Sequence, residues 1–340
     1  MNELEKYFEL ENGITVEELK ALFFNKDALK IQPRIVYRVG GTSERVYYTF
    51  DEAGEPFFYE SVTTALGRVL PTSPHLIKWI AEMGLEEAEL YKNERADYGT
   101  FMHIECSTLL IQKGIYNLDG VREKLKQYID ENQLPEKFIY HEEELKKDLL
   151  AFAQWCIDYK VKPLAIEIVL ADEETGLAGA LDLPCKMTVE EKGFFGEVYK
   201  SGANKGLPKE GKREIEINAL IDFKSGRKGF YDSHIFQLEA YKLIWNKHYP
   251  DVLIEKTYNW SPKAWRGSVP SYNFTEQSNR NVVDKMPHLL GLIAIDRRNK
   301  KSSILVCSGE INLAERSLDR NFVNINLSEL VKMQKGGRDA

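Results

Sequence analysis

The sequence predicts an α/β protein with a central mixed β-sheet flanked by helices. Helical periodicity dominates residues 74–133 and returns at residues 142–158. Strand-like segments rich in β-branched and aromatic residues follow, and an amphipathic helix at residues 234–245 interrupts them. Helices that precede and separate strands in this order are typical of a mixed sheet with helical neighbours.

Three regions are expected along the 340 residues. Residues 1–56 form an N-terminal appendage, residues 57–275 form the α/β core, and residues 276–340 form a C-terminal helical extension. The length alone allows either about two domains or one decorated α/β domain.

The N-terminal appendage is expected to hold a short helix and a β-hairpin. The helix begins near Thr15, a suitable N-cap that is followed three residues later by Glu18. The hairpin strands are residues 34–39 and 45–50, and the turn between them contains Gly40.

Composition places the chain among ordinary globular proteins, with 43% hydrophobic and 29% charged residues. The net charge of −7 argues against unspecific coating of a polyanion, so any contact with nucleic acid needs a local basic patch or bound cations. No apolar run approaches the roughly 20 residues of a membrane span, and the first residues lack a signal pattern. A cytoplasmic location without membrane contact is therefore expected.

A buried strand is predicted at residues 219–226. Asp222 and Lys224 are two residues apart and project from the same face of this strand. The other face carries Ala219, Ile221 and Phe223. Because unpaired buried ions are costly, the acid and the amine need partners, and a divalent metal shared with a second acid would provide one. Asp182, in Gly179-Ala-Leu-Asp182, is that second acid; alone, the three residues would indicate only a strand-end ion pair.

Three further segments accompany these residues. The first is a helix with a glycine and a histidine at i, i+4 on one face. The second is a strand at residues 164–170 with a single acid, and the third is a helix with a glutamine and a tyrosine one turn apart. In chain order these residues are Gly99 and His103, Glu167, then Gln237 and Tyr241.

In this order and at these spacings the motifs resemble the PD-(D/E)xK nuclease superfamily, above all its RecB-like and phage-type exonuclease branch. The lead-in at residues 60–84 is also similar to that of the mitochondrial genome maintenance exonucleases. The resemblance covers about residues 57–274. It implies a restriction-endonuclease-like core and a DNA exonuclease that depends on Mg²⁺ or Mn²⁺, with one or two ions, and acts in phage or bacterial recombination, repair or replication.

The resemblance also implies a metal site. Asp182 and Asp222 would supply hard oxygen ligands, which suit Mg²⁺ or Mn²⁺, and the Phe223 carbonyl would add another. His103 would be an imidazole ligand or would orient water. Glu167 would bind a second metal or orient the attacking water.

The remaining site residues are assigned to catalysis and substrate binding. Lys224 would orient or deprotonate the attacking water, or would neutralise the transition state as a cation. Gln237 and Tyr241 would position Lys224 or the scissile phosphate. Ser61 and Thr63, in a helix-capping context, would bind a terminal phosphate or cap the helix.

DNA is the expected partner, and a recombinase or single-strand annealing protein is the candidate protein partner. DNA ends are the simplest specificity, because no separate DNA-reading domain is evident. A DNA endonuclease of the same fold and a catalytically silent DNA-binding recombination accessory protein are the alternatives. The cysteines are scattered without C-x-x-C spacing, which argues against zinc, a disulfide framework and the iron–sulfur cluster of some RecB-like relatives. They are Cys106, Cys156, Cys185 and Cys307.

Two further features have both a structural and a functional interpretation. Residues 200–213 carry five basic residues against one glutamate, and they form either a solvated loop or a finger that contacts the DNA backbone. Trp260 and Trp265 could stack on unpaired bases, but core or strand-edge packing is favoured.

Overall fold

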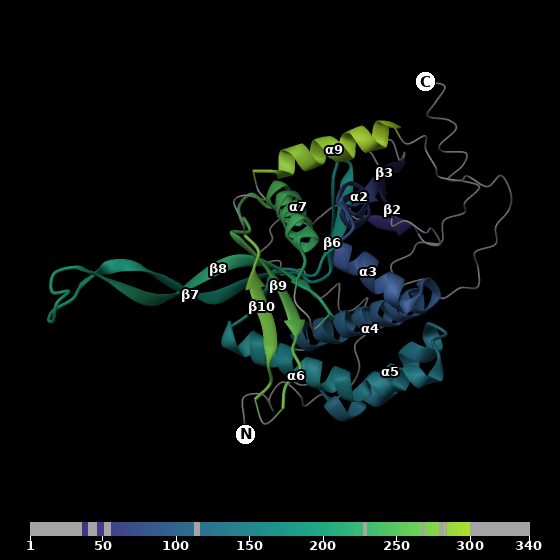
Figure 1. Ribbon diagram of the computed structural model, residues 1–340, viewed down its shortest axis with the longest axis horizontal. Coiled ribbons are helices and arrows are strands. Elements are labelled where there is room, and N and C mark those ends of the chain that lie inside the picture. Colours follow the sequence, from purple (N-terminus) through teal and green to yellow (C-terminus); the bar gives the residue numbers. More distant parts are fainter. Residues whose placement is uncertain are drawn as a thin grey trace.

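The computed structural model describes residues 36–39, 46–50, 56–111, 116–226, 230–266, 269–278, 282 and 284–299. These residues form two five-stranded mixed sheets with helices packed on them (Figure 1). The predicted α/β class with mixed sheet and flanking helices is confirmed, and its strands are shared between two sheets.

The first sheet joins the N-terminal hairpin to the core. The predicted hairpin is present as an antiparallel β1–β2 pair, and β3 continues it and pairs parallel to β6. The predicted helix near Thr15 lies outside the described residues. In spatial order the sheet contains β1 (Tyr37–Val39), β2 (Val46–Phe50), β3 (Pro56–Ser61), β6 (Leu177–Leu181) and β5 (Ile168–Asp172).

The second sheet carries the longest strands. Its strands β7 and β8 have 16 residues each and continue beyond the body of the protein as a two-stranded arm (Figure 1). Strands β9 and β10 complete the sheet beyond β8. In spatial order the sheet contains β10 (Tyr272–Glu276), β9 (Lys256–Pro262), β8 (Pro208–Phe223), β7 (Leu183–Val198) and β4 (Lys162–Pro163).

The chain passes between the two sheets at two neighbouring corners, which together we call the seam. Asp182 lies in the bend between β6 and β7, and Glu167 lies between β4 and β5. The backbone N–H of Glu167 donates to the carbonyl of Asp182 over 2.8 Å, which ties the corners together. The predicted strand at residues 164–170 is wrong in this part, because Glu167 has a left-handed φ of 48° and β5 begins only at Ile168.

Several of the described helices were predicted from the sequence. Gly99 and His103 lie in the second half of a helix of 27 residues. This helix begins at Leu85, 13 residues before the predicted start at Tyr98. The predicted helix at residues 142–158 is confirmed as α6. The described helices are α2 (Val62–Val69), α3 (Pro74–Met83), α4 (Leu85–Ile111), α5 (Val121–Glu131), α6 (Glu142–Asp158), α7 (Asp232–His248) and α9 (Met286–Asn299).

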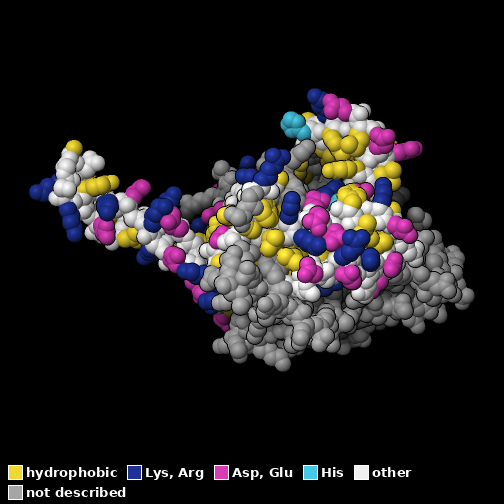
Figure 2. Space-filling view, turned by 90° about the horizontal axis from the view of Figure 1, so that it is seen from below, with side chains coloured by type: hydrophobic (Ala, Val, Ile, Leu, Met, Phe, Trp, Pro, Cys, Tyr) yellow, Lys and Arg dark blue, Asp and Glu magenta, His cyan; other side chains and the backbone are white. Residues whose placement is uncertain are grey.

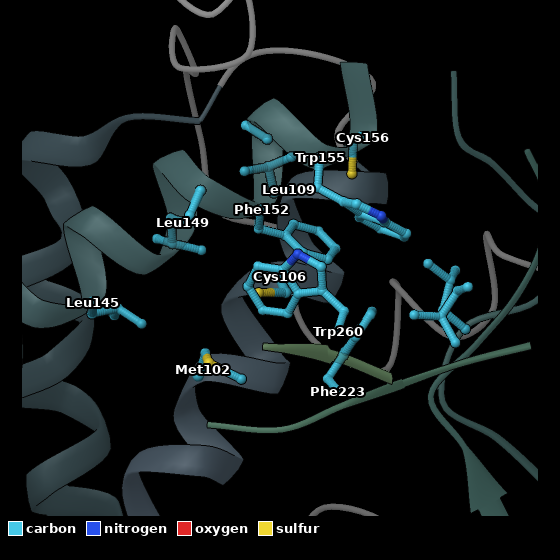
Figure 3. Packing of buried hydrophobic residues seen from close by; sticks show 14 of the residues in the cluster. Met102, Cys106, Leu109, Leu145, Leu149, Phe152, Trp155, Cys156, Phe223 and Trp260 are labelled. Atoms are coloured by element: carbon cyan, nitrogen blue, oxygen red, sulfur yellow. The ribbon is translucent and has the colours of Figure 1, made fainter. Parts of the chain in front are cut away.

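One hydrophobic core lies between the second sheet and helices α4 and α6 (Figure 3). Phe152 packs edge-on against Phe223 and Trp260, with ring centroids 5.2 and 5.1 Å away. Trp260 is fully buried, which confirms the packing interpretation for this residue. Ala219, Ile221 and Phe223 all face this core, as the alternation along β8 predicts.

A second core lies on the opposite side of β8 and involves the first sheet. It contains Leu220 of β8, Leu238 and Trp245 of α7, and Leu289 of α9. The described part of the predicted C-terminal extension is therefore helical and packs on the body. No helix in the described ranges is both long and apolar enough to span a bilayer.

Candidate metal centre

Three potential metal ligands meet at the seam. His103 comes from α4, and Glu167 and Asp182 come from the two corners where the chain changes sheets. One ligand atom of each residue lies within 4.8 Å of the others. Residues 64 and 79 positions away from His103 in the chain are thus brought to one point by the tertiary structure.

His103 lies between acids and a backbone carbonyl. Its Nδ1 is 3.2 Å from Oε1 of Glu167 and 3.8 Å from Oδ1 of Asp182. Its Nε2 is 3.2 Å from the carbonyl oxygen of Phe223. The backbone N–H of Phe223 donates to Oδ2 of Asp182 over 2.7 Å, so Phe223 offers its main chain to the site and its ring to the core.

The charges at the seam favour a cation. Burial disfavours the charged imidazole, but Asp182 and Glu167 outweigh burial and raise the pKa of His103 to about 9. Burial raises the pKa of Asp182 to about 7; His103 and Lys224 oppose this shift, and Glu167 and Asp222 add to it. Three acids, Glu167, Asp182 and Asp222, surround the two cationic groups of His103 and Lys224, so negative charge is in excess here.

The donor set fits Mg²⁺ or Mn²⁺. Two carboxylates and the Phe223 carbonyl are hard oxygen ligands, and the single imidazole makes Mn²⁺ more acceptable than an all-oxygen site would. Thiolates, which would favour zinc, are absent from this cluster in the described part of the chain.

Asp222 lies beside this cluster and is engaged by three donors. Nζ of Lys224 is 3.0 Å from Oδ1 and 2.8 Å from Oδ2 of Asp222. The Gln237 amide donates to Oδ1 over 2.9 Å, and the Asn259 amide donates to Oδ2 over 2.6 Å. The predicted strand at residues 219–226 is wrong at its end, because β8 stops at Phe223 and Lys224 follows it, although the ammonium group still contacts Asp222. The carboxylate of Asp222 is outside the group formed by His103, Glu167 and Asp182. Its role as a metal ligand stays a prediction.

Gln237 and Tyr241 occupy different positions although they lie one turn apart on α7. The Gln237 side-chain oxygen accepts from Nζ of Lys224 over 3.3 Å, which agrees with the predicted bracing of the lysine. Tyr241 is buried in the second core. A Cβ atom at Gly179 would lie 2.5 Å from the Tyr241 ring, so the glycine makes room for the tyrosine. Substrate binding by these two residues stays a prediction.

Gly99 has a comparable packing role. A Cβ atom there would lie 3.1 Å from Oγ of Ser225, the residue after Lys224. The small residue therefore lets α4 approach the end of β8, and His103 on the next turn reaches the seam. Gly99 thus provides the space between α4 and Ser225 that a larger side chain would fill.

Ser61 is the last residue of β3 in the first sheet, and Thr63 lies in the first turn of α2. Ser61 is the N-cap residue of α2, but its side chain makes no capping hydrogen bond and instead pairs with the Thr63 hydroxyl at 2.8 Å. Ser61 is aligned with Ala178 of β6, next to Gly179. The capping role by the Ser61 side chain is therefore wrong, and phosphate binding stays a prediction.

Three residues near the site were not singled out from the sequence. Asn259 lies opposite Asp222 in the parallel β8–β9 register, and an asparagine between the aromatic residues Tyr258 and Trp260 was the available signal. Arg95 donates to the carbonyl of Ser225 over 3.3 Å and lies one turn before Gly99 on α4. Burial and then Lys224 lower the pKa of His234 to about 4, with Asp222 opposing, which places this histidine beside the Lys224–Asp222 pair.

No protein-family model matches the chain, and no curated protein matches it either. A functional assignment therefore depends on the chemistry of these residues.

Proposed function

We propose that this chain is a divalent-metal-dependent deoxyribonuclease of the PD-(D/E)xK type that degrades DNA from its ends. The observation that supports it best is the meeting of His103, Glu167 and Asp182 within 4.8 Å, next to a lysine held by Asp222. An acidic, metal-accepting cluster beside a fixed ammonium group suits hydrolysis of a phosphodiester.

His103, Glu167, Asp182 and the Phe223 carbonyl would hold the ion. When bound, the ion would supply Lewis-acid polarisation of a phosphate and a more acidic water. The chain's own residues then position the groups around it: the main chain of Phe223 orients Asp182 and His103 through its N–H and carbonyl.

Lys224 is the residue that would contact the scissile phosphate. Asp222 and Gln237 hold its ammonium group from two sides, and its side chain keeps 24% of its surface exposed. A partly exposed, fixed cation can neutralise charge that develops on the phosphate, or exchange a proton with the attacking water. The side-chain amides of Asn259 and Gln237 also donate to Asp222 and fix its carboxylate beside the lysine.

The biological setting is part of the same proposal. Recombination, repair or replication of phage or bacterial DNA would use an end-dependent nuclease, with a recombinase or annealing protein as protein partner, in the bacterial or host cytoplasm. The support is the motif resemblance together with the site geometry.

A cleavage series tests the proposal. Linear, nicked and covalently closed circular DNA, single- and double-stranded, is incubated with the chain in Mg²⁺, Mn²⁺ or EDTA. Linear DNA should be shortened progressively in either metal, and closed circles should survive. Asp182→Asn should abolish the reaction, and Asp130→Asn, the same change at an exposed position on α5, should not.

The other outcomes separate the alternatives. Rapid linearisation of closed circles would indicate an endonuclease. DNA binding without cleavage in any metal would indicate a catalytically silent binding protein, and cleavage that continues in EDTA would contradict a metal-dependent mechanism.

A further inference from the structure

The β7–β8 arm is a two-stranded ribbon that extends away from the body (Figures 1 and 2). Its strands pair in continuous antiparallel register from Leu183–Ile221 at the base to Phe194–Glu210, and pairing resumes at Val198–Pro208. Residues 190–216 contain no buried side chain. An isolated ribbon of two strands is marginally stable, so this one needs support from its own side chains.

The shaft of the arm, which we define as residues 190–197 and 210–214, is reinforced by cross-strand contacts and carries five acids against three basic residues. The Phe195 ring lies over the cross-strand pair Gly193–Gly211, where added Cβ atoms would be 3.6 and 3.1 Å from it. The Arg213 guanidinium lies 4.5 Å from the centroid of the same ring. Ion pairs cross the ribbon from Lys212 to Glu190 at 2.9 Å and from Arg213 to Glu191 at 2.6 Å. These contacts keep the ribbon in one register.

The tip, which we define as residues 198–209, has a different composition. It contains three lysines and no acid. Lys209 has a distant partner in Glu197 at 3.5 Å, whereas Lys200 and Lys205 make no ion pair with any described residue. Tyr199 and Leu207 are exposed beside them, and dark blue side chains gather at the far end of the arm in Figure 2. The positive charge that is neutralised along the shaft is left free at the tip.

We propose that the tip binds the phosphate backbone of duplex DNA at a fixed distance from the bond being cut. This inference rests on the proposed function and adds a second DNA contact to it. On a chain with a net charge of −7, a patch of unpaired lysines is where a polyanion can approach. Tyr199 can lie against a sugar or a base edge, but the lysines supply the attraction.

The length of the arm defines that distance. A single strand, β8, connects Lys209 to Asp222, and 13 steps of about 3.3 Å give a separation of at most about 43 Å. At about 3.4 Å per base pair, this corresponds to about 12 or 13 base pairs. A duplex is stiff over this length and can meet two fixed points, whereas a flexible single strand can take many paths between them.

The test compares DNA longer and shorter than this reach. The variant Lys200→Glu/Lys205→Glu is measured by fluorescence anisotropy in Ca²⁺, which is expected to support binding without rapid turnover. For a duplex of about 30 base pairs we expect about tenfold weaker binding and a salt slope reduced by about 2. For a hairpin stem of about 8 base pairs, which is shorter than the reach, we expect no change.

Two further variants complete the design. Lys126→Glu/Lys147→Glu makes the same change in net charge at exposed lysines on α5 and α6, and it should leave both affinities unchanged. Replacing residues 195–209 by Asn-Gly closes the ribbon after Phe194–Glu210 with a two-residue turn, and it should reproduce the loss seen with the lysine variant. Circular dichroism checks that each variant is folded.

Several results would overturn the inference. They are an equal loss in the control variant, an equal loss for the short stem or for single strands, or unchanged DNA binding with an altered sedimentation coefficient, which would make the tip an interface between copies of the chain. Failure of the proposed function is seen separately, as absent cleavage by the wild-type chain. Arm-dependent binding of long duplex without cleavage would support the DNA contact at the tip and reject the nuclease.

Discussion

Strand β8 has one end beside the seam and the other in the arm, and its charged residues differ in burial between the two ends. At the end of β8 beside the seam, Asp222 is 3% exposed and lies next to Asp182 and Glu167, so that three acids face the two cationic groups of His103 and Lys224. Along the arm, Arg213 and Glu191 keep 58% and 40% of their side-chain surface and each charge faces its opposite. A buried, uncompensated charge costs several kcal/mol, whereas an exposed ion pair contributes about 0–1 kcal/mol.

This difference in burial indicates which charged residues affect activity and which affect only the free energy of unfolding. The proposed metal site would explain why buried acids gather at the seam although their burial lowers the stability of the protein without metal. Charges on the shaft select the register of the ribbon and leave the energy of folding nearly unchanged. Changes at the seam should therefore alter activity and metal response, and changes on the shaft should do little.

The largest effect is expected at the corner residue of the seam. Asp182→Asn should lower cleavage by at least about a thousandfold, because a metal ligand is lost. It should also remove the rise in thermal stability that metal gives the wild-type protein, which is about 2.7 kcal/mol at a hundredfold excess over Kd. Kinetics and calorimetry with and without Mn²⁺ measure both. A variant that still gains stability from Mn²⁺ would place the ion elsewhere.

The next effect separates the ammonium group from the metal. Lys224→Ala should slow cleavage by about 10²- to 10⁴-fold while the stabilisation by Mn²⁺ persists, because the lost interaction acts on the transition state. Lys224→Arg should not restore the rate, since guanidinium has a different donor geometry. Single-turnover cleavage rates and Mn²⁺ titrations of the two variants decide this. Normal cleavage by Lys224→Ala would remove the residue from the catalytic set.

The response to pH distinguishes the seam from any exposed cluster. In the metal-free protein the pKa of His103 is raised to about 9, so its favourable contribution is complete below its ordinary pKa of 6.5 and is lost as pH rises through 9. The pKa of Asp182 is raised from 3.8 to about 7, so ionisation of this buried acid destabilises the fold as pH rises through that window. Both groups predict lower stability at higher pH in EDTA.

Metal should reverse this trend, because it binds the deprotonated ligands. The stabilisation by Mg²⁺ should therefore grow between about pH 6 and 9. Urea unfolding at several pH values measures it. His103→Asn should flatten the dependence, and His75→Asn, at an exposed position on α3, should leave it unchanged. A metal effect that is independent of pH would contradict the proposed ligand set.

A smaller effect tests the packing behind the seam. Gly179→Ala should destabilise the protein by about 1–3 kcal/mol, because its new methyl group meets the Tyr241 ring. Tyr241→Leu in the same protein should recover part of that loss in a double-mutant cycle of urea unfolding. Gly67→Ala is the control: it has open space on helix α2 and should stabilise by about 0.5–1 kcal/mol. Additive effects of Gly179→Ala and Tyr241→Leu would refute the contact.

The smallest effect is expected on the shaft. Lys212→Ala removes the ion pair with Glu190 and should change the free energy of unfolding by less than about 1 kcal/mol, with no change in cleavage rate. Urea unfolding and a cleavage assay on the same preparation measure both. A loss comparable to that of Gly179→Ala would show that the shaft contributes to the fold as strongly as the buried contacts do.

Local patterns predicted much of this molecule. The alternation along β8 correctly placed Ala219, Ile221 and Phe223 on the core face, since side chains in a strand point to opposite faces in turn. Helical spacing likewise placed Gln237 one turn before Tyr241. These relations depend only on the backbone geometry of one element, so a sequence contains them.

Features that join elements were not predictable in the same way. Glu167 was expected inside a strand, but it lies in a left-handed corner that the hydrogen bond to Asp182 holds in place. Asn259 became a partner of Asp222 only through the parallel register of β8 and β9. Residues 208–213, expected in a loop, belong to β8 because they pair along β7.

The sequence by itself determined the α/β class, the helices and strands of the core, and the set of acids, imidazole and amine that suit a metal-dependent hydrolase. The tertiary structure alone decided that the strands divide between two sheets, that Glu167 and Asp182 lie at the seam with His103 between them, and that the arm carries its free charge at the tip. The physical reason is that periodicity acts over a few neighbouring residues, whereas register, corners and charge compensation depend on which distant segments pack together.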